Sequence, residues 1–593
     1  SAKERILDKL IKIYGDSKAK PAYTEIERLM KVYYAHKRPE QIAAEKNYHP
    51  ENRFSEKDIV LISYGDMIRS GNEAPLSQLY RFARKHLTET FNTIHILPFF
   101  PYSSDRGFSI KDFQQVDPDL GEWTDIHQIK SRFNLMVDLV LNHVSIEHRW
   151  FQEFLNANPA YIDFFIAFPD EDAIPPEQLK KIVRPRTSKL LSAFDVLDGQ
   201  KTVWTTFSRD QIDLNYQHWP VLCRMIEILL FYVRHGADVI RLDAVTYLWK
   251  KLGTACIHLE ENHLVVKLFR DILDAVAPHV ALITETNVPH SQNISYFGNG
   301  RDEAQMVYNF ALPPLLLHTF IAESSKKLTG WAKSLENLSD TATFFNFMDS
   351  HDGIGLPGAW EILDSAEIDT IVQAVRDRGG LISYKDNGDG TTSPYELNIT
   401  CYSVLNDNGR NEPESIKIDR YIATRSIPLV LAGVPAIYLH GLLGSQNAVE
   451  AVEADGIARS INRQTLDASR LYENISDSST LTAKIFRAFS DMIVKRRRES
   501  AFHPNCTQRV LDLSERIFAV VRTNGEKSGT LICLTNVTET AFETALNLTA
   551  MGAPEFSQIP IFTDILSNTP YDVQDGILNL KFAPYSVLWL KPA

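Results

Sequence analysis

The stretch GADVIRLDAVTYLWKK, residues 236–251, combines the pattern of a buried strand with two charged side chains. Its apolar run predicts a strand, and Arg241 and Asp243 stand two positions apart within it. Residues two apart on a strand point to the same face. Charges are rare in a buried strand unless they are paired, so we expect either a structural ion pair or the floor of an active site.

Seven further stretches have the same form, a short apolar run that ends in polar residues and is separated from the next run by helical patterns. Strands buried on both faces appear as continuous apolar runs, and alternation with helices indicates parallel pairing. Eight units predict an α/β fold, a (β/α)8 barrel, with a doubly wound open sheet as the alternative. The barrel is favoured because no glycine fingerprint follows the first run and because polar residues gather at several strand ends. The runs begin at residues 58, 93, 134, 238, 281, 304, 342 and 427.

The chain has 593 residues, too many for one hydrophobic core, and the barrel pattern is interrupted twice. After residue 500 the runs become short, β-rich and bounded by turns, which predicts a separate small domain. We therefore expect a helical N-terminal extension (1–57), the barrel (58–144 and 214–500), an inserted domain B (145–213), an insertion after the seventh strand (353–412) and a C-terminal β domain (501–593).

The amino-acid composition limits the kinds of molecule that this protein can bind. The net charge of −13 argues against a broad nucleic-acid footprint, and no apolar run is long enough to span a bilayer. The N-terminal stretch lacks the apolar core of a signal peptide. Five dispersed cysteines without CxxC spacing indicate buried free thiols rather than disulfides or zinc, so we expect a cytoplasmic protein. The linear pattern predicts no oligomeric state.

Polar residues follow four of the predicted strands, and in a barrel these strand ends converge on one mouth. No GxSxG elbow or Walker loop is present. The carboxylates could hold a divalent metal, but Arg241 beside Asp243 favours an ionised carboxylate instead. One ionised carboxylate and one carboxylic acid in different environments are typical of glycoside cleavage. The residues at the strand ends are Asp138, Asn142, His143, Arg241, Asp243, Glu285, Asp349, His351 and Asp352.

The ordered motifs DLVLNHVS, VIRLDAV, ITETN and MDSHD resemble those of the α-amylase superfamily, glycoside hydrolase family 13, from about residue 58 to the C-terminus. The resemblance implies that Asp243 is the nucleophile of a retaining double displacement. It implies that Glu285 is the general acid and base and that Asp352 stabilises the transition state. Many α-amylases hold calcium near the asparagine that corresponds to Asn142, but the branch described next generally does not.

The stretch LPFFPYSSDRGFSIKDF, together with RLDAVTY and INRQ, resembles sucrose phosphorylase and its relatives. The resemblance implies a glucose pocket with aromatic walls and hydrogen-bonding side chains, and sugar faces stack well on aromatic rings. Its members in this chain are Asp105, Phe108, His143, Arg241, Tyr247, His351 and Arg463.

The acceptor side departs from sucrose phosphorylase. The loops VRPRTSKLL and SPYELN match its phosphate-side loops, but Glu396 stands in place of a glutamine and Asn287 in place of a histidine. ETNVPH and PYELN resemble the branch that acts on glucosylglycerol and glucosylglycerate. The resemblance places phosphate and acceptor at Arg186, Gln211, Asn287, Tyr395 and Glu396.

We therefore expect a retaining α-glucoside phosphorylase that uses inorganic phosphate as co-substrate and needs no cofactor and no metal. Glycerol is the preferred acceptor, since Glu396 would repel the carboxylate of glycerate unless a cation intervened. Glucosylglycerate, sucrose and sucrose 6'-phosphate phosphorylases are the alternatives, and an α-glucosidase or transglucosidase of the same superfamily is a further one.

Overall fold

A computed structural model describes residues 1–593 except 72, 336–338, 388, 408, 550–555 and 557. Its centre is a closed barrel of parallel strands that pair in chain order, and β1 closes the ring by pairing with both β3 and β17. The (β/α)8 fold is therefore confirmed. The eight barrel strands are β1 (Val60–Ser63), β3 (Thr93–Ile96), β4 (Asn134–Val140), β10 (Ala237–Asp243), β11 (Ala281–Thr284), β12 (Met306–Tyr308), β13 (Thr343–Phe347) and β17 (Val434–Tyr438).

The eighth apolar run differs from the expectation. Its first residues, 427–430, end a helix, α15 (Glu414–Val430), and the strand starts only at Val434. Between them Gly433 has a φ of +146°, and a β-carbon placed on it would lie 2.5 Å from Nδ2 of Asn346. A buried helix end and a buried strand are equally apolar, so hydrophobicity alone does not separate them.

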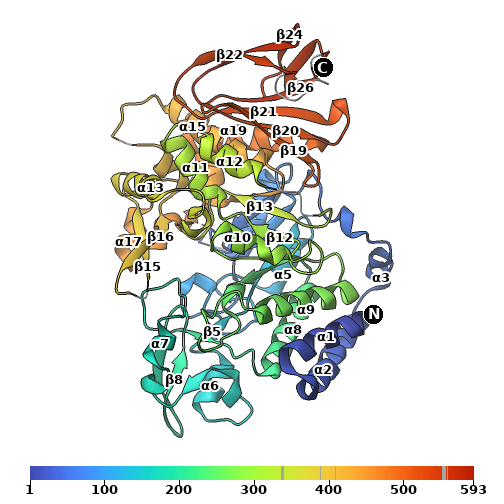
Figure 1. Ribbon diagram of the computed structural model, residues 1–593, viewed down its shortest axis with the longest axis vertical. Coiled ribbons are helices and arrows are strands. Elements are labelled where there is room, and N and C mark those ends of the chain that lie inside the picture. Colours follow the sequence, from blue (N-terminus) through green and yellow to red (C-terminus); the bar gives the residue numbers. More distant parts are fainter. Residues whose placement is uncertain (72, 336–338, 388, 408, 550–555, 557) are drawn as a thin grey trace.

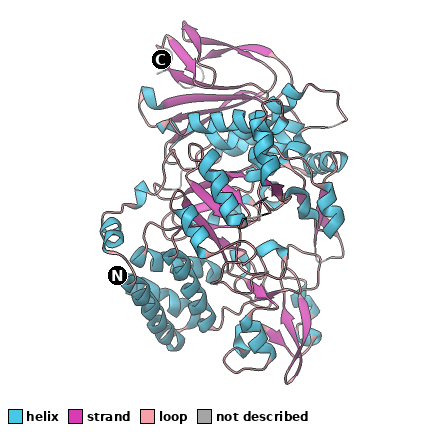
Figure 2. Cartoon of the chain, turned by 180° about the vertical axis from the view of Figure 1, so that it is seen from behind, coloured by secondary structure: helices cyan, strands magenta, loops and turns pink. Residues whose placement is uncertain are grey.

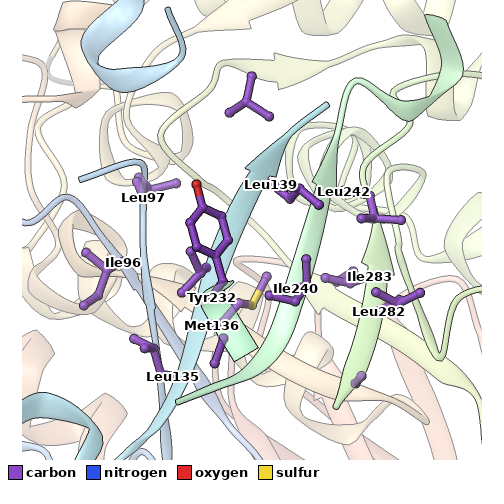
Figure 3. Close-up of a cluster of buried hydrophobic side chains, with 14 of the residues drawn as sticks. Ile96, Leu97, Leu135, Met136, Leu139, Tyr232, Ile240, Leu242, Leu282 and Ile283 are labelled. Atoms are coloured by element: carbon purple, nitrogen blue, oxygen red, sulfur yellow. The ribbon is translucent and has the colours of Figure 1, made fainter. Parts of the chain in front are cut away.

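Side chains along β10 point alternately to the two faces of the strand, and this explains how the barrel carries both an apolar core and a polar site. Arg241 lies level with Asp138 of β4, and Leu242 lies level with Leu139. Neighbouring residues on a strand point to opposite faces, so the charged pair and the leucines are separated. Figure 3 shows aliphatic side chains of β3, β4, β10 and β11 gathered near Tyr232 of α8 (Trp219–Arg234). This packing holds the strand that carries Arg241 and Asp243.

The helices that follow the strands surround the barrel (Figure 1). The N-terminal segment adds a helical hairpin, α1 (Ala2–Tyr14) and α2 (Asp16–Ala35), that packs on α8 and α9. It is fastened by Arg5 and Lys9, which both pair with Asp271 of α9. The other helices in this part of the chain are α3 (Pro39–Lys46), α4 (Pro75–His86), α5 (Trp123–Lys130), α9 (Glu260–Val276), α10 (His290–Asn293), α11 (Leu312–Ile321) and α12 (Lys326–Lys333).

Residues 145–213 leave the barrel between β4 and α8. β5 (His143–Ser145) and β9 (Gln211–Asp213) pair at the base of this insertion. Beyond them lie a small sheet and two helices, visible at the bottom of Figure 1. These elements are α6 (Arg149–Leu155), β6 (Ala167–Phe168), α7 (Pro176–Leu179), β7 (Leu191–Val196) and β8 (Gly199–Trp204).

The second insertion follows β13. It contains α13 (Ser365–Asp377) and a sheet in which β14 (Ile354–Gly355) and β15 (Leu381–Asp386) flank β16 (Thr392–Asn398). The chain then returns through α14 (Cys401–Leu405) to α15. After β17 come α16 (Leu439–Leu443), α17 (Val449–Asp455), the 3-10 helix η8 (Ala458–Asn462), α18 (Ala468–Ser476) and α19 (Leu481–Arg496). A short strand β18 (Leu466–Asp467) pairs with β2 (Ile68–Arg69).

The C-terminal part is an antiparallel sheet with its own apolar core, separate from the barrel core. It lies at one end of the molecule, away from the first insertion (Figure 2). Among the residues described, no helix has the length and apolarity needed to cross a membrane. The strands are β19 (Thr507–Ser514), β20 (Ile517–Thr523), β21 (Thr530–Asn536), β22 (Phe542–Asn547), β23 (Ile561–Asp564), β24 (Thr569–Gln574), β25 (Ile577–Phe582) and β26 (Val587–Pro592).

Candidate active site

A cavity opens at the C-terminal ends of the barrel strands, where the two insertions meet the mouth. Thirteen of the fifteen residues predicted for the site line it. The other two, Arg241 and Arg463, lie directly behind lining residues and bond to them. The predicted residues that line the cavity are Asp105, Phe108, His143, Arg186, Gln211, Asp243, Tyr247, Glu285, Asn287, His351, Asp352, Tyr395 and Glu396.

Arg241 supports Asp243 from inside the barrel. Its Nη1 donates a hydrogen bond of 2.9 Å to Oδ1 of Asp243 and another to Asp138. Only 1% of Arg241 is exposed. Asp138 is also held by Nε2 of His95, at 2.6 Å. The pair in the opening stretch is therefore both an ion pair and the floor of the cavity.

The two carboxyls above this floor are in unequal surroundings. Burial raises the pKa of both Asp243 and Glu285, and the charge of Arg241 opposes the rise in each. Arg241 hydrogen-bonds Asp243, but its Nη2 is 3.9 Å from Oε2 of Glu285. The backbone N–H of Ala244 donates to Glu285 at a longer 3.4 Å. A single negative charge is therefore more stable on Asp243, with the proton on Glu285.

Asp352 is a third carboxylate with its own cations. Burial raises its pKa, but Arg459, His351 and Arg463 outweigh burial and hold the pKa below the ordinary value. Nη2 of Arg463 is 3.5 Å from Asp352, and its Nε donates to the carbonyl of His351 at 2.6 Å. Asp352 is therefore ionised beside a carboxyl that keeps its proton.

The glucose-side residues form one connected wall. The rings of Phe108 and His351 stack with their centroids 5.0 Å apart and their planes 5° apart. Nε2 of His143 lies 2.9 Å from the carbonyl oxygen of Phe108, and burial lowers the pKa of His143, so the imidazole is neutral. Gln211, predicted on the acceptor side, instead donates to Asp105 at 3.3 Å and lies 3.2 Å from His143. The pairing of β5 with β9 brings it there.

The acceptor side carries a cation without a counter-ion. Arg186 lies over the ring of Phe207, 5.7 Å from its centroid, and Phe207 packs edge-on against Tyr247. Within the described part of the chain Arg186 forms no ion pair, and its Nη1 donates a hydrogen bond to the carbonyl of Pro185. Such a guanidinium can bind a carboxylate or a phosphate with two parallel hydrogen bonds.

Arg459 is a lining residue that the sequence analysis did not single out. Its Nε and Nη2 donate to the two oxygens of Glu396 at 2.9 and 2.6 Å, and its Nη1 donates to Asp352. Glu396 is therefore paired, which contradicts the premise on which glycerol was preferred as the acceptor. Arg459 stands four positions before Arg463 in ARSINRQ, on η8, and this proximity was the available signal.

An ammonium group lies beside the asparagine that follows the third barrel strand. Nζ of Lys250 donates to Oδ1 of Asn142 at 2.8 Å and pairs with Oδ2 of Asp213 at 2.7 Å. Asn142 also donates to Asp213 at 3.0 Å, which closes the triangle. Only 6% of Lys250 is exposed. A positive charge thus already balances the oxygens that a cation at this place would use.

Comparison with known proteins agrees with this geometry. Residues 87–354 match the Alpha-amylase family, described as the alpha amylase catalytic domain. A glucosylglycerate phosphorylase of Spirochaeta thermophila is 44% identical over 90% of this chain and 90% of its own length. A glucosylglycerate phosphorylase of Escherichia coli is 38% identical over 99% of this chain and 100% of its own. The crystal structure of a sucrose 6F-phosphate phosphorylase from Thermoanaerobacter thermosaccharolyticum superposes with a TM-score of 0.71 at 27% identity, over 81% of this chain and 94% of that one.

The chain belongs to the α-amylase family, glycoside hydrolase family 13. Within that family its relatives are phosphorylases of α-glucosides, and it is an enzyme of this phosphorylase type.

Proposed function

We propose that this enzyme transfers glucose from 2-O-α-glucosylglycerate to phosphate and releases α-glucose 1-phosphate and glycerate. The observation that carries the choice of acceptor is the pairing of Glu396 with Arg459. Among the described residues on that side of the cavity, this pairing leaves Arg186 as the charged group without a counter-ion. An anionic acceptor is favoured beside a free guanidinium. The names of two relatives support the same acceptor.

The first half-reaction forms a glucosyl-enzyme. Asp243, held by Arg241, attacks the anomeric carbon, and Glu285 gives its proton to the departing oxygen of glycerate. Burial keeps that proton on Glu285 until it is needed. Asp352 holds the glucose, with Arg463 behind it in contact with the His351 carbonyl and Asp352. His143 and His351 contribute neutral imidazoles, and Phe108 and Tyr247 give apolar faces.

The second half-reaction replaces glycerate by phosphate. Glycerate leaves before phosphate enters in a double displacement, so the same guanidinium, Arg186, serves both anions in turn. Tyr395 lines this side of the cavity with its hydroxyl 3.5 Å from the carbonyl of Asn287. A phosphate oxygen attacks the anomeric carbon and the bond to Asp243 breaks. Glu285, which gave its proton to glycerate, takes one from the entering phosphate and returns to its starting state, and the two inversions give net retention.

The reaction as proposed uses no cofactor and no metal. Lys250 supports this, because its ammonium already pairs with Asn142 and Asp213. We keep the prediction of a cytoplasmic enzyme, which is supported by five free cysteines, four of them buried, in the described residues.

The test is a synthesis assay that follows phosphate released from glucose 1-phosphate with glycerate, glycerol, fructose and fructose 6-phosphate as separate acceptors. We expect glycerate to exceed glycerol by about tenfold or more, since a hydrogen bond to a charged group contributes about 1.5–3 kcal/mol. A faster reaction with glycerol than with glycerate would favour glycerol, the acceptor expected from the sequence. Free glucose released at the same rate without any acceptor would indicate a hydrolase.

A further inference from the structure

Arg459 connects the catalytic side of the cavity to the acceptor side. It lies on η8, which packs against β16 of the second insertion and against α17. Its guanidinium reaches Asp352, which follows β13, and Glu396, which lies on β16. Three segments that are far apart in the sequence therefore meet at one side chain.

Glu396 is poorly placed to bind an acceptor, because its oxygens are already hydrogen-bonded and buried. Both of its oxygens accept hydrogen bonds from Arg459, and only 3% of the residue is exposed. It is also confined by the backbone: a β-carbon placed on Gly353 would lie 2.5 Å from Cγ of Glu396. A carboxylate held in this way orients its partner arginine more effectively than it binds a mobile polyol.

We propose that Arg459 is a positioning residue that holds Asp352 in place and ionised, and that Glu396 anchors Arg459 instead of binding the acceptor itself. The bidentate contact fixes the plane of the guanidinium, so that Nη1 is presented to Asp352. This assignment rests on the proposed glucosyl transfer but not on which acceptor is used.

The charges around Asp352 decide in which direction its pKa moves when Arg459 is removed. Removal of the nearest cation, Arg459, leaves a half-buried carboxyl whose desolvation favours the protonated form. Asp243 and Glu285 disfavour its charge further, since each interacts with Asp352. The titratable and charged groups that face Asp352 are Tyr64, Arg241, Asp243, Glu285, His351, Arg459 and Arg463.

The experiment uses α-glucosyl fluoride, a donor whose leaving group needs no proton from Glu285 and no acceptor pocket. Arg459→Met should lower the rate of glucosyl-enzyme formation about 100-fold, the effect of removing one charged hydrogen-bond donor from a reacting centre. The acid limb of kcat/KM should move up by about one pH unit and become steeper, because two carboxyls must then lose protons. Arg459→Lys should recover the position of the limb in part, since it retains the charge.

Glu396→Gln and Glu396→Ala separate the two roles of Glu396. The amide can still accept from Nε of Arg459, so Glu396→Gln should stay within a few fold of the parent. Glu396→Ala should slow glucosyl-enzyme formation from the fluoride, and its overall rate should fall by the same factor whichever acceptor is supplied afterwards. Arg420→Met is the matched control. Arg420 donates to both oxygens of Glu412, at distances of 3.0 and 2.8 Å, and this pair lies outside the cavity. This variant should leave the pH profile unchanged.

An acid limb that stays in place in Arg459→Met would overturn the proposal. So would a Glu396→Ala variant that forms the glucosyl-enzyme normally but loses affinity for one acceptor only. Circular dichroism and thermal unfolding of each variant identify a loss of fold. If Arg459→Met or Glu396→Ala fails to fold, the pH profiles of Arg459→Lys and Glu396→Gln test the proposal in their place. Failure of glycerate as an acceptor would contradict the proposed function and leave this result untouched.

Discussion

Arg241 binds Asp243 and Asp138 through the same nitrogen, Nη1, and its Nη2 lies 3.9 Å from Glu285. One buried guanidinium thus sets the charge of two carboxyls with different tasks. The contact with Asp243 is direct, and the contact with Glu285 is not. Because Asp243 is buried and Glu285 is half-buried, both carboxyls are largely withdrawn from water, and this difference decides which of them carries the charge.

Replacement of Arg241 by lysine should therefore reduce kcat/KM about 100-fold or more, because an ammonium cannot reproduce the planar contact with Asp138 and Asp243. Steady-state kinetics with glucose 1-phosphate and glycerate measure the loss. Arg425→Lys is the control, since Arg425 pairs with Asp349 outside the cavity. Equal losses in both variants would show a general effect on folding.

The basic limb of the pH profile should belong to Glu285. Its pKa is raised by burial, so it keeps its proton as the pH rises past the range of an ordinary glutamate and loses activity only above its own pKa. This limb should be present with the glucoside and absent with α-glucosyl fluoride, which needs no protonation. A limb that persists with the fluoride would assign it to another group.

Glu285→Gln should make the same distinction by mutation. We expect about a 1,000-fold loss with the glucoside and at most a tenfold loss in glucosyl-enzyme formation from the fluoride, because general acid catalysis contributes about 10²–10⁴. Asp243→Asn should abolish both reactions, since no covalent bond can then form. Rapid-quench analysis of the glucosyl-enzyme measures both.

Arg186→Ala should weaken phosphate and glycerate together. Loss of a charged bidentate contact costs about 1.5–3 kcal/mol, or roughly 10–150-fold in KM for each anion, while glycerol should be affected less than threefold. Arg209→Ala is the control from the same insertion, because Arg209 lies over Phe194 instead of the cavity. Equal effects on glycerate and glycerol would remove Arg186 from the acceptor site.

Lys250→Met should lower the free energy of unfolding by about 3–5 kcal/mol, because it leaves the charge of Asp213 buried without its partner. Lys251→Met is the control, since Lys251 is exposed. Chemical denaturation compares the two. Chelators should change neither the stability nor the activity of the parent enzyme. A strong loss of activity on chelation would revive a metal site near Asn142.

Much of the site could be predicted because the chemistry follows strand ends. Asp243 ends β10, Glu285 directly follows β11, and Asp352 lies a few residues beyond β13. Parallel strands in a closed barrel bring those ends together. Gln211 was harder to place, since the pairing of β5 with β9 sets its neighbours. The last strand was misplaced for a similar reason, because a buried helix end precedes it.

The sequence by itself determined the barrel and the carboxyls at its mouth, since local hydrophobic patterns and residue types are enough for both. Only the tertiary structure decided the charge balance of the site. Arg459 and Glu396 are 63 positions apart and Lys250 and Asn142 are 108 apart, so no local pattern shows that they pair. Coulomb interactions depend on distance in space, and a carboxylate that is paired presents a different surface to the acceptor from one that is free.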